Sequence, residues 1–110
     1  DLPHGECNAL LLEHVVRFNF PAAAERYRRI AAELGIDARG MSDGECALRL
    51  AGELAALRAR VGIAGGLAER GVRAADLPEL AAHAVKDACI FTNPRRVSPS
   101  DAQAIYGDAT

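Results

Sequence analysis

The chain has 110 residues, of which 50% are hydrophobic and 25% are charged, and its formal net charge is -2. The high apolar content and small net charge exclude intrinsic disorder, and three cysteines are too few for a disulfide scaffold. Because 13 basic residues stand against 15 acidic ones, a nucleic-acid partner is disfavoured. A membrane partner is not expected either, since no apolar run approaches the roughly 20 residues that span a bilayer.

The start of the chain has none of the features of a secretion signal. It begins at Asp1 rather than Met and continues as Leu2-Pro3-His4-Gly5. We therefore interpret the sequence as a chain entered midway and expect a cytoplasmic protein.

The first half of the sequence predicts three helices, because Ala, Leu, Arg and Glu are abundant and alternating β-branched runs are absent. The first helix is expected from about Gly5 to Phe18, with a polar stripe so narrow that the helix should lie inside a larger body. Pro21 is expected to begin the second helix and Gly35 to end it. The expected buried stripe of that second helix consists of Tyr27, Ile30 and Leu34.

A Ser-x-x-Glu capping box at Ser42 predicts the start of the third helix, which should end at Gly62. A short helical piece from Leu67 to Arg70, closed by Gly71, is expected to follow. The expected inward face of the third helix consists of Cys46, Leu50, Leu54, Leu57 and Val61.

The last third of the chain predicts two more helices. Asp76 is the expected cap of the fourth helix, which the run Thr92-Asn93-Pro94 should end. Ser98 and Asp101 should cap a final helix that ends near Gly107. The expected inward residues of the fourth helix are Leu77, Leu80, Ala81, Ala84 and Ala88. The whole pattern predicts an all-α protein with about five main helices, compatible with a helical bundle.

His4 is the histidine most suited to chemistry, since it stands between a proline and a glycine where an apolar helix begins. A neutral imidazole there could bind zinc or iron, or the residue could simply begin the helix; spacing alone favours the second interpretation. His14 lies about three turns further along the same helix, so these two residues cannot bind one ion. A closed metal site needs about four ligands, and the chain does not visibly supply them.

The other candidate side chains are assigned mostly structural roles. Cys46 is expected to be inert packing, and Cys7, one turn after His4, is favoured as a buried apolar residue that could also line the same region. Cys89 lies where the fourth helix should end, and a pocket wall and simple packing stay equally open. We expect His83 to be solvated and assign no catalytic residue. A solvated helix face is also expected for three arginines: Arg26, Arg28 and Arg29.

Three stretches of the chain carry motifs in a fixed order. The first, from Pro3 to Asn19, contains Pro-His-Gly, Asn-Ala and His-Val before a final Phe-Asn. The second contains Gly71-Val72 and then Asp76-Leu77-Pro78 with Leu80-Ala81, and the third contains Asp87-Ala88-Cys89 and then Thr92-Asn93-Pro94-Arg95. Together they resemble the C-terminal end of the iron-containing (group III) alcohol dehydrogenases over essentially the whole chain.

This resemblance implies a fold and a set of site residues. Residues 1–110 would be the C-terminal part of a helical domain of the dehydroquinate-synthase-like and iron alcohol dehydrogenase type, without the α/β nucleotide-binding domain. In that family one Asp and three His hold iron, sometimes zinc, and the last of these ligands would be His4. Cys89 would line the substrate or cofactor pocket, with Cys7 nearby. Two departures from the family pattern are Glu13, which replaces the usual proline, and the pair Glu6-Cys7.

The implied activity is the oxidation of a small alcohol to an aldehyde or ketone, or the reverse, with NAD(P) and Fe²⁺ or Zn²⁺ in the full-length parent. A homo-oligomer is expected. With one metal ligand of four, the segment alone should be inactive, should bind neither cofactor tightly and should expose apolar surface, especially around residues 10–16. The alternative is a non-catalytic regulatory or assembly module built on the same helical scaffold.

Overall fold

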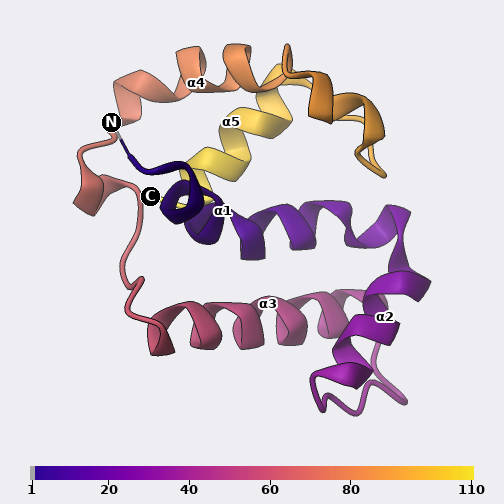
Figure 1. Ribbon diagram of the computed structural model, residues 1–110. Helices are drawn as coiled ribbons and strands as arrows, with labels where there is room; N and C mark the ends of the chain where they lie inside the picture. The colour runs from indigo at the N-terminus through magenta and orange to yellow at the C-terminus, as the bar shows by residue number, and fades with distance from the viewer. Residues whose placement is uncertain (1) are drawn as a thin grey trace.

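The structure, a computed structural model, describes residues 2–110, and in this range it contains five α-helices joined by loops and 3₁₀ turns and no strand. The helices are α1 (His4–Asn19), α2 (Ala24–Glu33), α3 (Asp43–Arg60), α4 (Leu77–Ala84) and α5 (Pro99–Asp108). Helix α1 lies between α3 and α5, α2 covers one end of the α1–α3 pair, and α4 packs on α5 (Figure 1). The predicted all-α architecture is therefore confirmed. No helix of the described range is long and apolar enough to cross a membrane.

The buried apolar side chains form two clusters, one against the first half of α1 and one against its second half. The larger cluster joins α1, α2 and the first half of α3 and consists of Val16, Phe20, Ala31, Ile36, Cys46, Ala47 and Leu50. The smaller cluster joins the start of α1 to the loop after α3 and the end of α5, and consists of Leu10, Leu67 and Ala109. Cys46 is completely buried, which confirms its predicted packing role.

The second predicted helix is interrupted near its start. Pro21 lies in a 3₁₀ turn, η1 (Phe20–Ala22), rather than at the start of an α-helix, and Ala23, whose backbone is not helical (φ -143°, ψ 36°), separates this turn from α2. A proline suits the first position of either kind of helix, because its missing N–H is not needed there. The predicted end at Gly35 is confirmed by its left-handed backbone, with φ of 86°.

The buried face of α2 also differs from the prediction. Ile30 and Leu34 are 47% and 48% exposed, whereas Ala31 is completely buried. Of the predicted stripe, Tyr27 packs against the larger cluster and stacks on Phe20 with ring centroids 5.6 Å apart. Helical spacing identifies residues that share a face, but it does not say which face a neighbouring helix will cover.

Helix α3 begins as predicted but is buried over only half its length. The Ser42 hydroxyl oxygen accepts a hydrogen bond from the backbone N–H of Glu45 at 3.1 Å, which confirms the cap. Leu50 is buried as expected, but Leu57 and Val61 are 46% and 65% exposed because no described element covers the last turns of the helix on that side.

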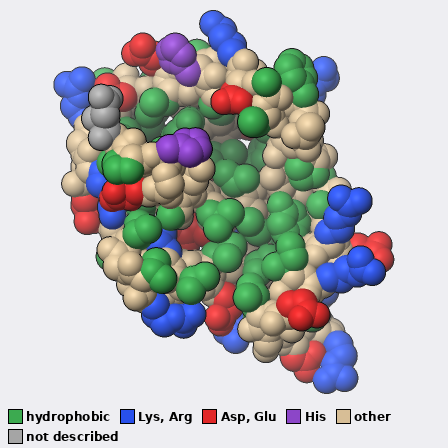
Figure 2. All heavy atoms as spheres, viewed as in Figure 1, with side chains coloured by type: hydrophobic (Ala, Val, Ile, Leu, Met, Phe, Trp, Pro, Cys, Tyr) green, Lys and Arg blue, Asp and Glu red, His purple; other side chains and the backbone are tan. Residues whose placement is uncertain are grey.

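Apolar surface is exposed elsewhere too. Figure 2 shows hydrophobic side chains gathered over the middle of one face, with charged side chains along the rim. Within residues 10–16 the expectation of exposed apolar surface is wrong for Leu10 and Val16, which are buried in the two clusters, and Leu12 alone is largely exposed. The other strongly exposed large side chains include Leu48 and Phe91.

The fourth helix is shorter than predicted, because it ends at Ala84 and a separate 3₁₀ helix, η4 (Ala88–Thr92), follows. The Asp87 carboxylate accepts the backbone N–H of Cys89 at 2.8 Å and so begins the new turn. Ala88, which was expected to face inward, is consequently exposed. Asp76 is the N-cap residue of α4, as predicted, but its side chain makes no capping hydrogen bond to that helix.

Side-chain caps hold the 3₁₀ turn before α4 and the start of α5 after it. Asp76 makes no side-chain cap to α4 but accepts the backbone N–H of Arg73 at 2.8 Å, and so closes η3 (Ala74–Asp76). The predicted capping box of α5 is confirmed in both directions, since Ser98 Oγ accepts the Asp101 N–H at 3.1 Å and Asp101 accepts the Ser98 N–H at 3.0 Å.

Glu13, where the family usually has a proline, forms an ion pair that joins α1 to α3. Its carboxylate lies 2.8 Å from the Arg58 guanidinium, and the two side chains are only 12% and 15% exposed. Arg58 also donates to the carbonyl oxygens of Ile63 at 2.8 Å and Gly65 at 3.1 Å. A proline could not make this contact, so Glu13 helps to hold both α3 and the loop that follows it.

The three arginines of α2 are not all solvated as expected. Arg28 is partly buried and donates to the carbonyl oxygens of Ala38 at 3.3 Å and Met41 at 2.8 Å. It also pairs with the carboxylate of Asp43 at 2.8 Å. Arg28 therefore holds the loop between α2 and α3, whereas Arg26 and Arg29 are exposed.

We predict that Glu13→Gln lowers the free energy of unfolding by about 1.5–3 kcal/mol, because the Arg58 charge would keep only a neutral partner in a largely buried position. Urea unfolding followed by circular dichroism measures this loss. The matched control is Glu53→Gln, since Glu53 pairs with Arg49 at 3.8 Å on an exposed surface. That change should stay within about 0.5 kcal/mol of the unmodified protein. Equal losses in the two variants would contradict the structural role of Glu13.

We predict that Asp101→Asn weakens the dependence of stability on acid pH. The backbone N–H of Ser98, followed by its hydroxyl, lowers the pKa of Asp101 below the ordinary value for aspartate. The carboxylate therefore stabilises the fold above the ordinary pKa of about 4, and this contribution is lost as pH falls through the lowered value. Thermal unfolding measured from neutral to strongly acidic pH should show a shallower decline for Asp101→Asn. A slope unchanged from the unmodified protein would exclude this contribution.

Candidate functional site

A cavity of about 560 Å³ opens where the start of α1 faces the loop after α3 and helix α4. Its wall includes His4 and Cys7 from α1, His83 from α4 and Tyr106 from α5. Pro3 precedes the helix, and its carbonyl oxygen accepts the backbone N–H of Cys7 at 3.0 Å. This start places His4 in the first turn of α1, on the rim of the cavity.

The side chain of His4 is exposed and has a hydrogen-bond partner on its own helix. The Asn8 amide nitrogen lies 3.1 Å from Nε2 of His4. The roles of the two atoms depend on the tautomer of the ring, and in one tautomer Nε2 carries a lone pair. That is the state of an imidazole nitrogen that can bind a metal ion.

A complete metal site is not present among residues 2–110, where no group of three or more His, Cys, Asp or Glu side chains could hold an ion. His4 fits one ligand position because its side chain is exposed and one tautomer of its ring leaves a lone pair on Nε2. The other ligands of a four-coordinate or five-coordinate ion would have to come from outside this range.

The start of α1 is tied to the opposite wall by an ion pair between Glu6 and Arg70. Arg70 also donates to the carbonyl oxygen of Gly66 at 3.2 Å, so it holds the loop that borders the cavity. On the same side, burial followed by the proximity of Cys7 raises the pKa of Tyr106. Of the two residues that depart from the family pattern, Glu6 therefore stabilises the cavity wall through its ion pair with Arg70, and Cys7 lines the cavity.

Cys89 is exposed in η4 and is not among the residues that line the cavity with His4 and Cys7. The neighbouring Asp87 side chain, as a hydrogen-bond acceptor and then as a negative charge, raises the pKa of the Cys89 thiol. In turn the backbone N–H and side chain of Cys89 lower the pKa of Asp87, and the charge of His4 adds a smaller contribution. The Asp87–Cys89 segment is thus within electrostatic reach of His4.

His83 is exposed, as predicted, but it lies in the same cavity wall as His4. Its Nε2 atom lies 3.8 Å from the carboxylate of Glu79, one turn earlier on α4. The sequence indicated a solvated histidine, and only the fold brings this residue to the cavity.

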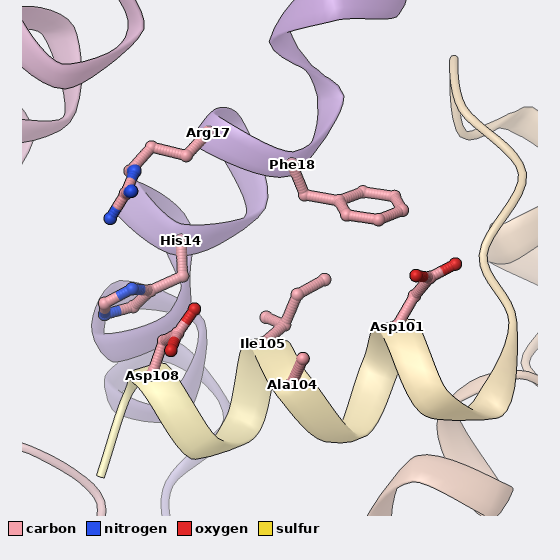
Figure 3. Close-up of a pocket in the computed structure, with 7 residues that line it drawn as sticks. All are labelled: His14, Arg17, Phe18, Asp101, Ala104, Ile105 and Asp108. Carbon is pink, nitrogen blue, oxygen red and sulfur yellow. The ribbon is translucent and has the colours of Figure 1, made fainter. Parts of the chain in front are cut away.

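His14 faces a different hollow, of about 240 Å³, between α1 and α5. Figure 3 shows His14 and Arg17 of α1 opposite Asp108 and Asp101 of α5. The Nε2 atom of His14 lies 3.5 Å from the carboxylate of Glu13. His14 therefore does not share a cavity with His4, as the spacing along the helix predicted.

The ends of two motif stretches meet through a pair of asparagines that the sequence did not single out as site residues. Asn19, at the end of α1, donates to Asn93 at 2.9 Å, and Asn93 donates back to Asn19 at 2.8 Å. Arg95 lies 4.1 Å above the ring of Phe18 and donates to its carbonyl oxygen at 2.8 Å. These contacts fix η4, and with it Cys89, against α1.

The fold and cavity together describe an all-helical domain that presents a Pro-His-Gly histidine at the rim of a cavity. Residues 1–110 match the model of the Fe-containing alcohol dehydrogenase family, C-terminal. The chain therefore belongs to the iron-containing alcohol dehydrogenase family and corresponds to the C-terminal part of its members, as the motif stretches predicted.

Individual relatives agree with this assignment. The chain is 40% identical over 107 residues to lactaldehyde reductase of Escherichia coli, covering 97% of this chain and 28% of that protein. It is 37% identical over 109 residues to 1,3-propanediol dehydrogenase of Klebsiella pneumoniae, covering 99% of this chain and 28% of that protein. A solved alcohol dehydrogenase from Oenococcus oeni superposes with a TM-score of 0.92 at 32% identity, covering 100% of this chain and 29% of that one. The chain thus spans between a quarter and a third of the length of these relatives.

We predict that Asp87→Asn makes Cys89 react faster with iodoacetamide at mildly alkaline pH. Removing the Asp87 charge lowers the raised pKa of the thiol toward its ordinary value, and the thiolate is the reactive form. Peptide mass spectrometry over time measures the rate. The matched control is Asp37→Asn, because Asp37 pairs with Arg39 in a distant loop. A Cys89 rate that is the same in both variants would contradict the assigned cause of the raised pKa.

Proposed function

We propose that the full-length protein carrying this segment is an NAD(P)-dependent, iron-dependent alcohol dehydrogenase that interconverts a small alcohol and its aldehyde or ketone. Family membership supports this function, as do the names of three relatives: lactaldehyde reductase, 1,3-propanediol dehydrogenase and the NAD-dependent methanol dehydrogenase of Bacillus methanolicus. The observation that carries the proposal is the His4 side chain of the Pro-His-Gly motif, which is exposed at the cavity rim.

In this proposal residues 1–110 form the C-terminal part of the helical domain, and His4 is one of the iron ligands. Bound iron would polarise the alcohol oxygen as a Lewis acid, and NAD(P) would carry the hydride. The remaining iron ligands and the nucleotide-binding domain would lie outside these 110 residues.

The other residues of the site would bind and orient rather than react. Cys7 and Tyr106 form part of the cavity wall next to His4, and the Glu6–Arg70 pair keeps that wall closed against α1. Cys89 is proposed to face the substrate or cofactor from the outer side of the site, since it lies on the exposed segment that follows Asp87. Its raised pKa keeps the thiol protonated, which suits a wall residue better than a nucleophile.

Exposed apolar side chains support a further part of the proposal, which is that the full-length protein covers this surface and assembles as a homo-oligomer. Phe91 is 86% exposed and Val61 is 65% exposed. Such large apolar side chains on the surface are typical of places where another part of a protein, or another copy, packs.

We predict that His4→Ala in the full-length protein lowers iron content and alcohol-dependent NAD(P) reduction together. The affinity for iron and the rate of NAD(P) reduction should each fall by more than about 100-fold, because losing a ligand costs more than losing a residue that only supports one. Elemental analysis and absorbance of the reduced nicotinamide measure the two effects.

The matched control is His83→Ala, because His83 lies in the same cavity wall and is not proposed as a ligand. Iron content that stays normal in His4→Ala would contradict the ligand assignment. A full-length protein that holds iron but oxidises no alcohol would favour the regulatory alternative.

A further inference from the structure

Another cavity, of about 130 Å³, lies between α1, α5 and the η4 segment, and we call it the apolar pocket. Helix α1 contributes Leu11, Val15 and Phe18 to its wall, and η4 contributes Ile90. Ala102 of α5 also lines it and is buried, yet this residue belongs to neither apolar cluster. The apolar pocket is therefore a space between helices that neither of the two cores fills.

The lining of the apolar pocket offers a ligand few polar groups. Its two amides, those of Asn19 and Asn93, donate to each other at 2.9 Å and 2.8 Å and so satisfy one another. Burial and then the proximity of Cys7 raise the pKa of Tyr106, so the hydroxyl of this residue lies toward the other cavity, which Cys7 lines. An engineered apolar cavity of roughly 150 Å³ binds benzene. The size and chemistry of this pocket therefore suit a small hydrocarbon group.

The apolar pocket and the 560 Å³ cavity are lined by successive turns of the same helices. On α1, Cys7 lines the larger cavity and Leu11, four residues later, lines the apolar pocket. On α4, Leu80 and Ala84 stand in the same relation. Residues four apart share one face of a helix, and Tyr106 of α5 lines both spaces. The two spaces are therefore neighbours with shared walls on three helices, one polar at the start of α1 and one apolar next to η4.

We propose that the apolar pocket is the subsite for the hydrocarbon part of the alcohol or aldehyde, and that it favours an unbranched apolar chain. This inference rests on the proposed function, which places the reacting oxygen at iron held by His4. Leu11 follows His4 by seven residues, roughly 10 Å along the helix axis, so a substrate reaches the apolar pocket when it carries several carbons beyond the reacting one. Each methylene that enters the pocket leaves water, which should raise kcat/KM about threefold to fourfold.

The first test measures kcat/KM of the full-length protein for unbranched primary alcohols, from absorbance of the reduced nicotinamide. The value for hexanol should exceed that for butanol by about tenfold, because two more methylenes are buried. Equal values for the two alcohols would overturn the inference and would indicate that another segment of the full-length chain occupies the apolar pocket.

The second test fills the apolar pocket with Ala102→Leu. The matched control is Ala104→Leu, because Ala104 lies on the same helix but lines the separate hollow of His14 (Figure 3). The ratio of kcat/KM for hexanol to that for butanol should fall about tenfold in Ala102→Leu and keep its unmodified value in Ala104→Leu. The same ratio in both leucine variants would overturn the inference.

An enlarged pocket gives a change that a poorly folded protein does not produce. Val97, in the loop before α5, is half-buried and lines the apolar pocket. Val97→Ala should raise the ratio of kcat/KM for octanol to that for hexanol by about threefold, since the removed methyl groups leave room for a longer chain. A ratio that stays the same or falls would contradict the assigned subsite.

Binding of hexanol to the metal-free full-length protein separates the subsite from the reaction. Isothermal titration calorimetry should show a negative heat-capacity change, the mark of apolar burial, and an affinity about tenfold lower in Ala102→Leu than in Ala104→Leu. Equal affinities would overturn the inference and leave the proposed function standing. The expected difference in affinity, in a full-length protein that holds iron but oxidises no alcohol, would keep the apolar pocket as a binding site and overturn the proposed function instead.

Discussion

The packing of α1 against α3 on one side and α5 on the other is the contact on which the remaining structure depends. In the second half of α1, Val16 enters the cluster shared with α2 and α3, and in its first half Leu10 enters the cluster shared with the end of α5. One rigid helix therefore connects two small cores that have no buried residue in common. It also carries His4 at one end and Asn19 at the other, so the cavity and the η4 segment are oriented by the same element.

The boundaries of the helices could be predicted from the sequence where a local hydrogen bond determines them. The caps at Ser42 and Ser98 and the left-handed glycine at Gly35 depend only on residues within a turn, and all three are confirmed. Burial was less predictable, because it depends on which neighbour arrives. Val61 continues the apolar stripe of α3 perfectly well and is nevertheless exposed, since no described element covers it. The early end of α4 was not predicted. The Asp87 side chain begins a separate 3₁₀ turn, and the sequence alone does not show that this turn replaces a longer helix.

The candidate site was predictable to the extent that its residues are close in sequence. His4 and Cys7 lie one turn apart and do share a cavity, whereas His83 joins them only because α4 packs on α5 and so faces the same cavity. The asparagine pair joins residues 74 positions apart, and such a contact leaves no periodic signal in a single sequence. The resemblance to a known family indicated that both ends were important, but it did not indicate that they touch.

The asparagine pair has one chemical property that its place in the sequence explains. Asparagine side chains deamidate to aspartate when the backbone nitrogen of the next residue attacks the side-chain carbonyl. An aspartate at either position would place a carboxylate where an amide now donates a hydrogen bond. Asn93 is followed by Pro94, whose nitrogen has no hydrogen and cannot carry out this attack, and Asn19 is followed by the bulky Phe20 inside a helical segment. The contact between α1 and η4 is thus built from two asparagines whose sequence neighbours disfavour deamidation.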